Sequence, residues 1–192
     1  VDPAGRATIS LVQGYLAANT VDLDAAEHLL SDCLTRLQGN ESSRWIAAFA
    51  HNGMGSLTLA RGDVQQALLE FETSRRVAAE SGNLGAQMQA LVFTASVRLF
   101  EGDTDVARTL LLEATDLVEQ QPYYDGNAYC LEVAAAHALA AGDATAAARA
   151  LGQAHALREL IGARVWSLLE QMSERVHAGV LGVLGEAAFA ET

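Results

Sequence analysis

Three stretches of the sequence share one pattern: RGDVQQALLEF at residues 61–71, EGDTDVARTLL at 101–111 and AGDATAAARAL at 141–151. Each has Gly-Asp near its start and continues with apolar residues at helical spacing. Glycine commonly ends a helix and aspartate commonly caps the next one, so each Gly-Asp pair predicts a sharp corner between two helices. The corners are 40 residues apart, and a fourth copy, TVDLDAAEHLL at 20–30, lies one residue off this register. A period of this length indicates a helical repeat architecture.

A helical pattern stands on both sides of every corner, so each repeat is predicted to be an antiparallel pair of helices. Asp63 is the expected N-cap of one such helix, and Gln66 follows at the spacing of a capping box. Pro122 can stop a helix, so the stretch QPYYDGN is expected to be a linker in which Tyr123 and Tyr124 are exposed. The predicted repeats span about 5–40, 44–82, 84–121 and 127–161, and a capping helix spans about 163–185.

Small residues recur at three fixed positions relative to each corner, where the backbones of paired helices are expected to cross closely. Seven residues before the corner stand Gly14, Gly55, Ala95 and Ala135. Five residues after it stand Ala26, Ala67, Ala107 and Ala147, and twelve after it stand Cys33, Ser74, Ala114 and Ala154. The register therefore predicts a buried seam of small side chains in every helix pair.

Composition excludes several classes of protein. The 192 residues carry a formal charge of −12, and all 12 basic residues are arginine. Without lysine there is no Schiff-base lysine and no P-loop ending in Gly-Lys. An acidic chain with scattered arginines is not expected to bind nucleic acid directly. No apolar run has the length of a membrane span, so no membrane association is expected. The chain opens VDPAG without a methionine, and we expect it to be part of a larger protein.

The residues that commonly carry chemistry show no catalytic or metal-binding pattern. Cys33 and Cys130 belong to no CxxC pair, so they are predicted to be small buried hydrophobes in a reducing, cytoplasmic environment. The five histidines include no i, i+4 pair and no HExxH. We therefore expect a chain that is not an enzyme and that has no cofactor, no catalytic residues and no metal site.

The Gly-Asp corner and the three small positions resemble the tetratricopeptide repeat (TPR) family over about Ala7 to Ile161, with a period of 40 residues in place of 34. The resemblance implies an all-α, right-handed superhelical solenoid of four helix pairs with a C-terminal capping helix. In that register the first helix of each pair lines a concave groove. The implied groove residues, which would contact a protein, a peptide or a small-molecule effector, are Asn52, Ser56, Gln89, Ser96, Tyr129 and Glu132.

The stretch from Ala156 to Thr192 carries a second resemblance. The motifs Leu157-Arg158, Ile161-Gly162-Ala163, Leu184-Gly185-Glu186 and Ala188-Phe189 are similar to the end of the helical arrays of LuxR-type and related large ATPase transcriptional regulators. This resemblance implies an interaction or effector-sensing module of a multidomain bacterial regulator whose other domains would bind ATP and DNA. A free-standing scaffold of a protein assembly is the alternative, and an enzyme is a more distant one. The sequence does not determine the ligand or the oligomeric state.

Overall fold

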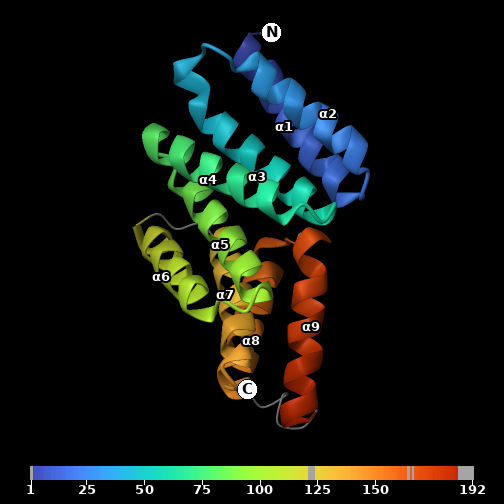
Figure 1. Ribbon diagram of the computed structural model, residues 1–192, viewed down its shortest axis with the longest axis vertical. Coiled ribbons are helices and arrows are strands. Elements are labelled where there is room, and N and C mark those ends of the chain that lie inside the picture. Colours follow the sequence, from blue (N-terminus) through green and yellow to red (C-terminus); the bar gives the residue numbers. More distant parts are fainter. Residues whose placement is uncertain (1, 121–123, 164, 166, 186–192) are drawn as a thin grey trace. The chain divides into compact units, whose positions relative to one another are not determined.

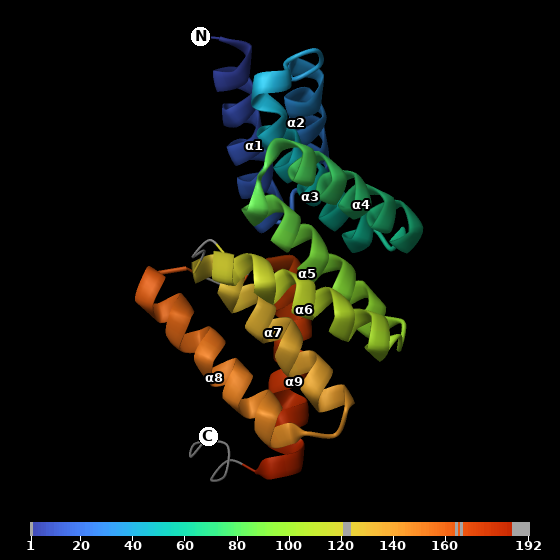
Figure 2. The same cartoon turned by 90° about the vertical axis from the view of Figure 1, so that its left-hand side faces the viewer.

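The computed structural model describes residues 2–120, 124–163, 165 and 167–185, and this part of the chain is all-helical. Figure 1 and Figure 2 show successive helices joined by short connections. The helices are α1 (Pro3–Asn19), α2 (Leu23–Arg36), α3 (Arg44–Ala60), α4 (Val64–Ser81), α5 (Leu84–Phe100), α6 (Thr104–Gln120), α7 (Tyr124–Ala140), α8 (Ala144–Ile161) and α9 (Ser167–Leu184), with a 3₁₀ turn at Glu41–Ser43. The predicted all-α class is confirmed, and the right-handed superhelix remains a prediction.

The predicted corners join α1 to α2, α3 to α4, α5 to α6 and α7 to α8. At the second corner the backbone N–H of Asp63 donates to the carbonyl of Thr58 at 2.9 Å, and its carboxylate accepts from the backbone N–H of Gln66 at 3.1 Å. One aspartate thus closes the end of one helix and caps the start of the next. Asp22, Asp103 and Asp143 make the same pair of bonds.

The residue before each corner aspartate takes the left-handed backbone conformation. Gly62, Gly102 and Gly142 have φ between +84° and +86°. In the first corner this position is Val21, with φ +62°. A left-handed conformation is costly for a β-branched residue, so the first corner is strained in a way that the other three are not.

The seam of small residues is buried, as the register predicts. All twelve positions of the seam are buried, and Ala67, Ala107 and Ala147 have no exposed surface at all. The seam is tight enough to exclude a methyl group in two pairs, because a Cβ added at Gly55 would lie 2.5 Å from Phe71 Cε1 and one added at Gly14 would lie 2.9 Å from Leu30 Cδ2. The small side chains therefore set how closely the paired helices approach.

The chain divides into two compact units, residues 1–93 and 94–192, so that the boundary falls inside α5. In the first unit α1 pairs with α2 and α3 pairs with α4, and α2 also packs on α3. In the second unit α7 pairs with α8, α6 packs on α7, and α9 packs on both α7 and α8. The α9 packing buries Leu151 of α8 against Val176 and Val180. The role of α9 as the cap of a solenoid stays a prediction.

The stretch QPYYDGN is only partly a linker, because α7 begins at Tyr124 inside it. Asp125 stands in the first turn of α7, where a negative charge is favourable. Pro122 and Tyr123 lie outside the described residues, as does the 186–189 part of the C-terminal motif. The structure does not describe the side chains of Tyr123 and Tyr124, so their predicted exposure stays a prediction.

Candidate functional site

Three aromatic residues on the first helices of the first unit keep part of their surface in contact with solvent. Trp45 at the start of α3 is 45% exposed, and Phe49 lies one turn later and is half-buried. The hydroxyl of Tyr15, on α1, donates to the carbonyl of Phe49 at 2.8 Å, which ties the two helices together. We call Tyr15, Trp45 and Phe49 the aromatic surface of the first unit.

A hydrogen bond from Asn83 also fixes the backbone of Trp45. Asn83 donates from Nδ2 to the carbonyl of Trp45 at 3.2 Å, and its Oδ1 accepts from the backbone N–H of Ala86 in the first turn of α5 at 3.0 Å. Asn83 therefore caps α5 and fixes the start of α5 against the start of α3.

The predicted groove residues of the first unit, Asn52, Ser56 and Gln89, are buried. Asn52 donates from Nδ2 to the carbonyl of Ala86 and to Oε1 of Gln89, both at 3.0 Å. Ser56 donates to the carbonyl of Asn52, one turn back on the same helix. The structure thus brings Asn52 and Gln89 together as a polar link between α3 and α5. Oδ1 of Asn52 is buried and accepts no hydrogen bond from any described residue.

In the second unit the predicted residues Tyr129 and Glu132 are both buried, and they meet at Arg158. Arg158 of α8 donates from Nε and Nη2 to the two carboxylate oxygens of Glu132, at 2.7 and 3.0 Å. Its Nη1 donates to Asp125 at 2.9 Å, and its guanidinium lies 4.6 Å from the centre of the Tyr129 ring. Two-point binding of a carboxylate and stacking on an aromatic ring are the contacts that arginine makes best.

Burial alone would lower the pKa of Arg158, but its hydrogen bonds and charge interaction with Glu132, together with Tyr129 and Asp125, raise that pKa above the ordinary value. The guanidinium is therefore permanently charged and holds α8 on α7. In the sequence Arg158 stands out only as part of the C-terminal motif. Its role depends on the burial of Glu132 beside it, which the sequence does not reveal.

Five of the six predicted groove residues are thus buried between helices, and Ser96 of α5 is half-buried. These side chains make contacts within the protein because the packing of neighbouring helices covers the faces that bear them. Their role as ligand contacts stays a prediction.

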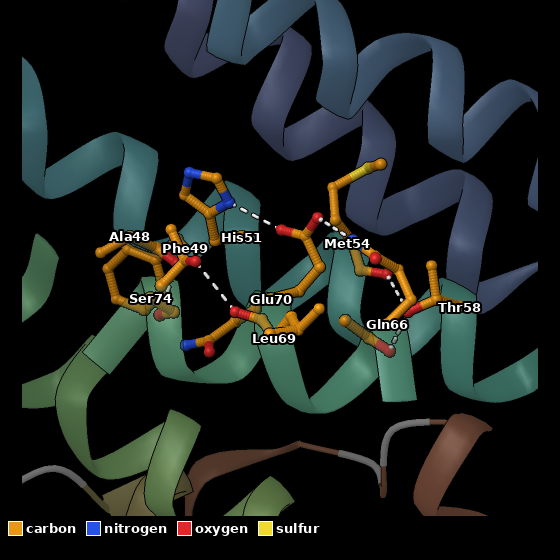
Figure 3. Close-up of polar contacts among 12 residues, drawn as sticks. Ala48, Phe49, His51, Met54, Thr58, Gln66, Leu69, Glu70 and Ser74 are labelled. Atoms are coloured by element: carbon orange, nitrogen blue, oxygen red, sulfur yellow. Dashed lines mark hydrogen bonds and ion pairs between the residues drawn. The ribbon is translucent and has the colours of Figure 1, made fainter. Parts of the chain in front are cut away.

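Sequence reasoning missed the pairing of a histidine with a carboxylate on the first unit. Figure 3 shows His51 of α3 and Glu70 of α4 directed toward each other, with Nδ1 and Oε2 2.8 Å apart. Nε2 of Gln66 donates to the other carboxylate oxygen of Glu70 at 3.1 Å. When Nδ1 carries the proton and donates to Glu70, Nε2 of His51 is left as an acceptor. The contact orients the ring and links α3 to α4.

Cys33 and Cys130 are buried free thiols, as predicted. Burial raises the pKa of Cys33 to about 11 and that of Cys130 to about 12. A thiol is nucleophilic and binds metals only as the thiolate, so both side chains are inert at neutral pH. Among the described residues no group of three His, Cys, Asp or Glu side chains could hold a metal ion.

No described helix is both long and apolar enough to cross a membrane. No protein-family model, curated protein or solved structure matches the chain. The two family resemblances therefore rest on the residues quoted for them.

Proposed function

We propose that this chain is a non-catalytic helical-repeat module that binds a protein, a peptide or a small effector through the first helices of its pairs. The observation that supports this proposal is the aromatic surface of the first unit, where Trp45 keeps nearly half of its area in contact with solvent. Tryptophan and tyrosine are the residues on which protein interfaces most often depend.

The backbone around this surface is held before any partner arrives. Tyr15 is bonded to the carbonyl of Phe49, Asn83 is bonded to the carbonyl of Trp45, and Asn52 with Gln89 ties α3 to α5. A surface that is already ordered loses little conformational entropy on binding, so a larger share of the contact energy remains as affinity.

By resemblance, we further propose that the module belongs to a large ATPase-type regulator of the LuxR kind, where it would sense an effector or a protein partner. The coding sequence on either side of this chain tests that placement. A nucleotide-binding P-loop domain before it and a helix-turn-helix domain after it would support the regulator. Flanks with neither domain would favour the free-standing scaffold.

A selection of displayed random peptides against the whole chain tests the binding function. Binding is followed by the fluorescence anisotropy of a dye-labelled copy of each selected peptide, a readout that does not need a tryptophan in the chain and so works for Trp45→Ala as well. We expect Trp45→Ala to weaken the selected peptides by about tenfold or more, as for a central interface aromatic. The matched control is Leu69→Ala on α4, another exposed apolar side chain, which should bind normally.

The proposal fails if the selected peptides bind Trp45→Ala and the parent chain equally well. A changed urea midpoint in Trp45→Ala would show that the substitution perturbs folding, and Tyr15→Phe would then be used. That variant removes only the hydroxyl bonded to Phe49, so it should loosen the aromatic surface and weaken binding.

A further inference from the structure

The outer side of α1 carries three large apolar residues in contact with solvent. Ile9 and Val12 are each 53% exposed and Leu16 is 60% exposed. Their spacing of three and seven residues places them on one face of the helix. We call Ile9, Val12 and Leu16 the α1 apolar face. The other exposed large apolar side chains of the described residues do not form a row of three on one helix.

The repeat register shows that most of this face is buried in each of the later first helices. The positions equivalent to Val12 are Gly53 of α3, Phe93 of α5 and Val133 of α7, and all three are buried. The positions equivalent to Ile9 are Ala50, Ala90 and Cys130, which are also buried. The positions equivalent to Leu16 are Leu57 and Val97, which are buried, and His137, which is half-buried. Only α1 leaves all three of these positions exposed.

In two cases within the first unit the structure shows what covers the face. On α3 the nearest cover is Leu30 from α2, since a Cβ added at Gly53 would lie 2.7 Å from Leu30 Cδ1 and 3.4 Å from Tyr15 Cε2 of α1. On α5 it is Phe71 from α4, whose ring centre lies 5.4 Å from that of Phe93. Leu30 and Phe71 occupy the same position of the repeat. The cover is therefore the second helix of the preceding hairpin, which presents one large apolar side chain.

The start of α1 also resembles the start of a helix that follows another hairpin. Asp2 caps α1 by accepting from the backbone N–H of Gly5 at 2.7 Å. Asn83, at the equivalent position directly after α4, caps α5 in the same way through Ala86. The entry to α1 thus has the local geometry of the entry to α5.

We propose that the α1 apolar face binds one further helical hairpin of the same repeat type, whose second helix sets a large apolar side chain against Val12 as α4 sets Phe71 against Phe93. The last hairpin of a second copy does not supply this contact. Its side chain at the equivalent position, Leu151, is already buried against Val176 and Val180 of α9.

The chain's own α3–α4 hairpin serves as the probe. An extended chain is made in which residues 41–82 are placed directly before Asp2, so that Gly82 takes the place of Val1. A single reporter, Val12→Cys, is labelled with a maleimide in the extended chain and in the parent, because Cys33 and Cys130 are buried. His28→Cys, on the exposed side of α2, is the matched control site.

We expect Val12→Cys to react at least about tenfold more slowly in the extended chain, because a packed side chain reacts only when the hairpin opens. The control at His28→Cys should react equally fast in both chains. Phe71→Asp within the added copy alone should restore fast labelling at Val12→Cys.

Two results would overturn the proposal. One is equal labelling of Val12→Cys with and without the extension. An added hairpin that stays unfolded has the same meaning, because the same hairpin folds when it packs against α5 in the native chain and would therefore have found no matching surface on α1. The other is slow labelling in the parent chain that speeds up on dilution, together with a dimeric mass in sedimentation. That would show that a second copy covers the face.

Discussion

Replacing Gly55 by alanine should destabilise the protein, although alanine is the better helix former. The added Cβ would lie 2.5 Å from Cε1, 2.6 Å from Cδ1 and 3.1 Å from Cζ of Phe71. Phe71 is 1% exposed and packs on Phe93, so its ring has no open space to move into. The α3–α4 crossing must therefore widen to accept one methyl group.

Two opposing effects set the magnitude. Glycine to alanine within a helix stabilises by about 1 kcal/mol through helix propensity. Overpacking a tight core contact costs about 1–3 kcal/mol. The difference predicts that Gly55→Ala lowers the free energy of unfolding by about 1 kcal/mol, with a range of about 0–2 kcal/mol.

Gly152→Ala is the matched control. Gly152 is an exposed residue of α8, and nothing lies within 4 Å of the Cβ that it would gain. The same substitution there should stabilise by about 0.5–1 kcal/mol. If the free energy of unfolding falls for Gly55→Ala and rises for Gly152→Ala, the difference measures the packing cost at Gly55 separately from the helix propensity of alanine.

The assay is urea unfolding followed by circular dichroism. Gly55 and Gly152 lie in different compact units, so a control inside the first unit is also needed. Gly55→Ala is therefore also measured in a Phe71→Leu background, which removes the ring that the added Cβ would contact. Gly55→Ala should be better tolerated there than in the parent, and the two changes should not be additive. If Gly55→Ala instead stabilises the parent as much as Gly152→Ala does, the close crossing of α3 and α4 is refuted.

Three further predictions follow from single contacts. Val21→Gly should stabilise the chain by about 0.5–1 kcal/mol, because the gain from removing a β-branched residue in the left-handed conformation exceeds the entropy that glycine adds to the unfolded chain. Val21 is 67% exposed, so little burial is lost, and an unchanged or lower urea midpoint would contradict the strain. Glu132→Leu should destabilise by about 3 kcal/mol, because the buried guanidinium of Arg158 loses its ion pair with a buried carboxylate. Adding Arg158→Met should recover most of the loss, and a neutral single variant in thermal unfolding would count against the buried pair. Cys130 should lower the free energy of unfolding between pH 9 and about 12, because its thiol ionises near 9 in the unfolded chain but only near 12 in the folded one. Cys130→Ala should make the fall in this range less steep in denaturant titrations, with Cys33 still contributing, and an identical slope in both chains would speak against the raised pKa.

The local signals of the sequence determined the helix pairs. Gly-Asp fixes a corner because glycine accepts the left-handed conformation and aspartate caps the next helix, and both effects act within a few residues. The small positions, including Ala67 and Ala107, were predictable for a similar reason, since a close crossing leaves no room for larger side chains. The start of α7 at Tyr124 was missed because tyrosine, glycine and asparagine are weak helix formers, and a predicted linker gave no reason to extend the helix.

What the polar residues do was decided by the tertiary structure. The repeat register places Asn52, Gln89 and Glu132 on the side expected to face a groove, but it does not say how far the neighbouring helices cover that side. Packing brings Asn52 to Gln89 across 37 positions of the sequence and Glu132 to Arg158 across 26. A buried polar group must find a partner, and the available partners depend on which helices meet. For the same reason, the sequence marks Ile9, Val12 and Leu16 as ordinary apolar positions of a repeat, and only the tertiary structure shows that no described helix covers them.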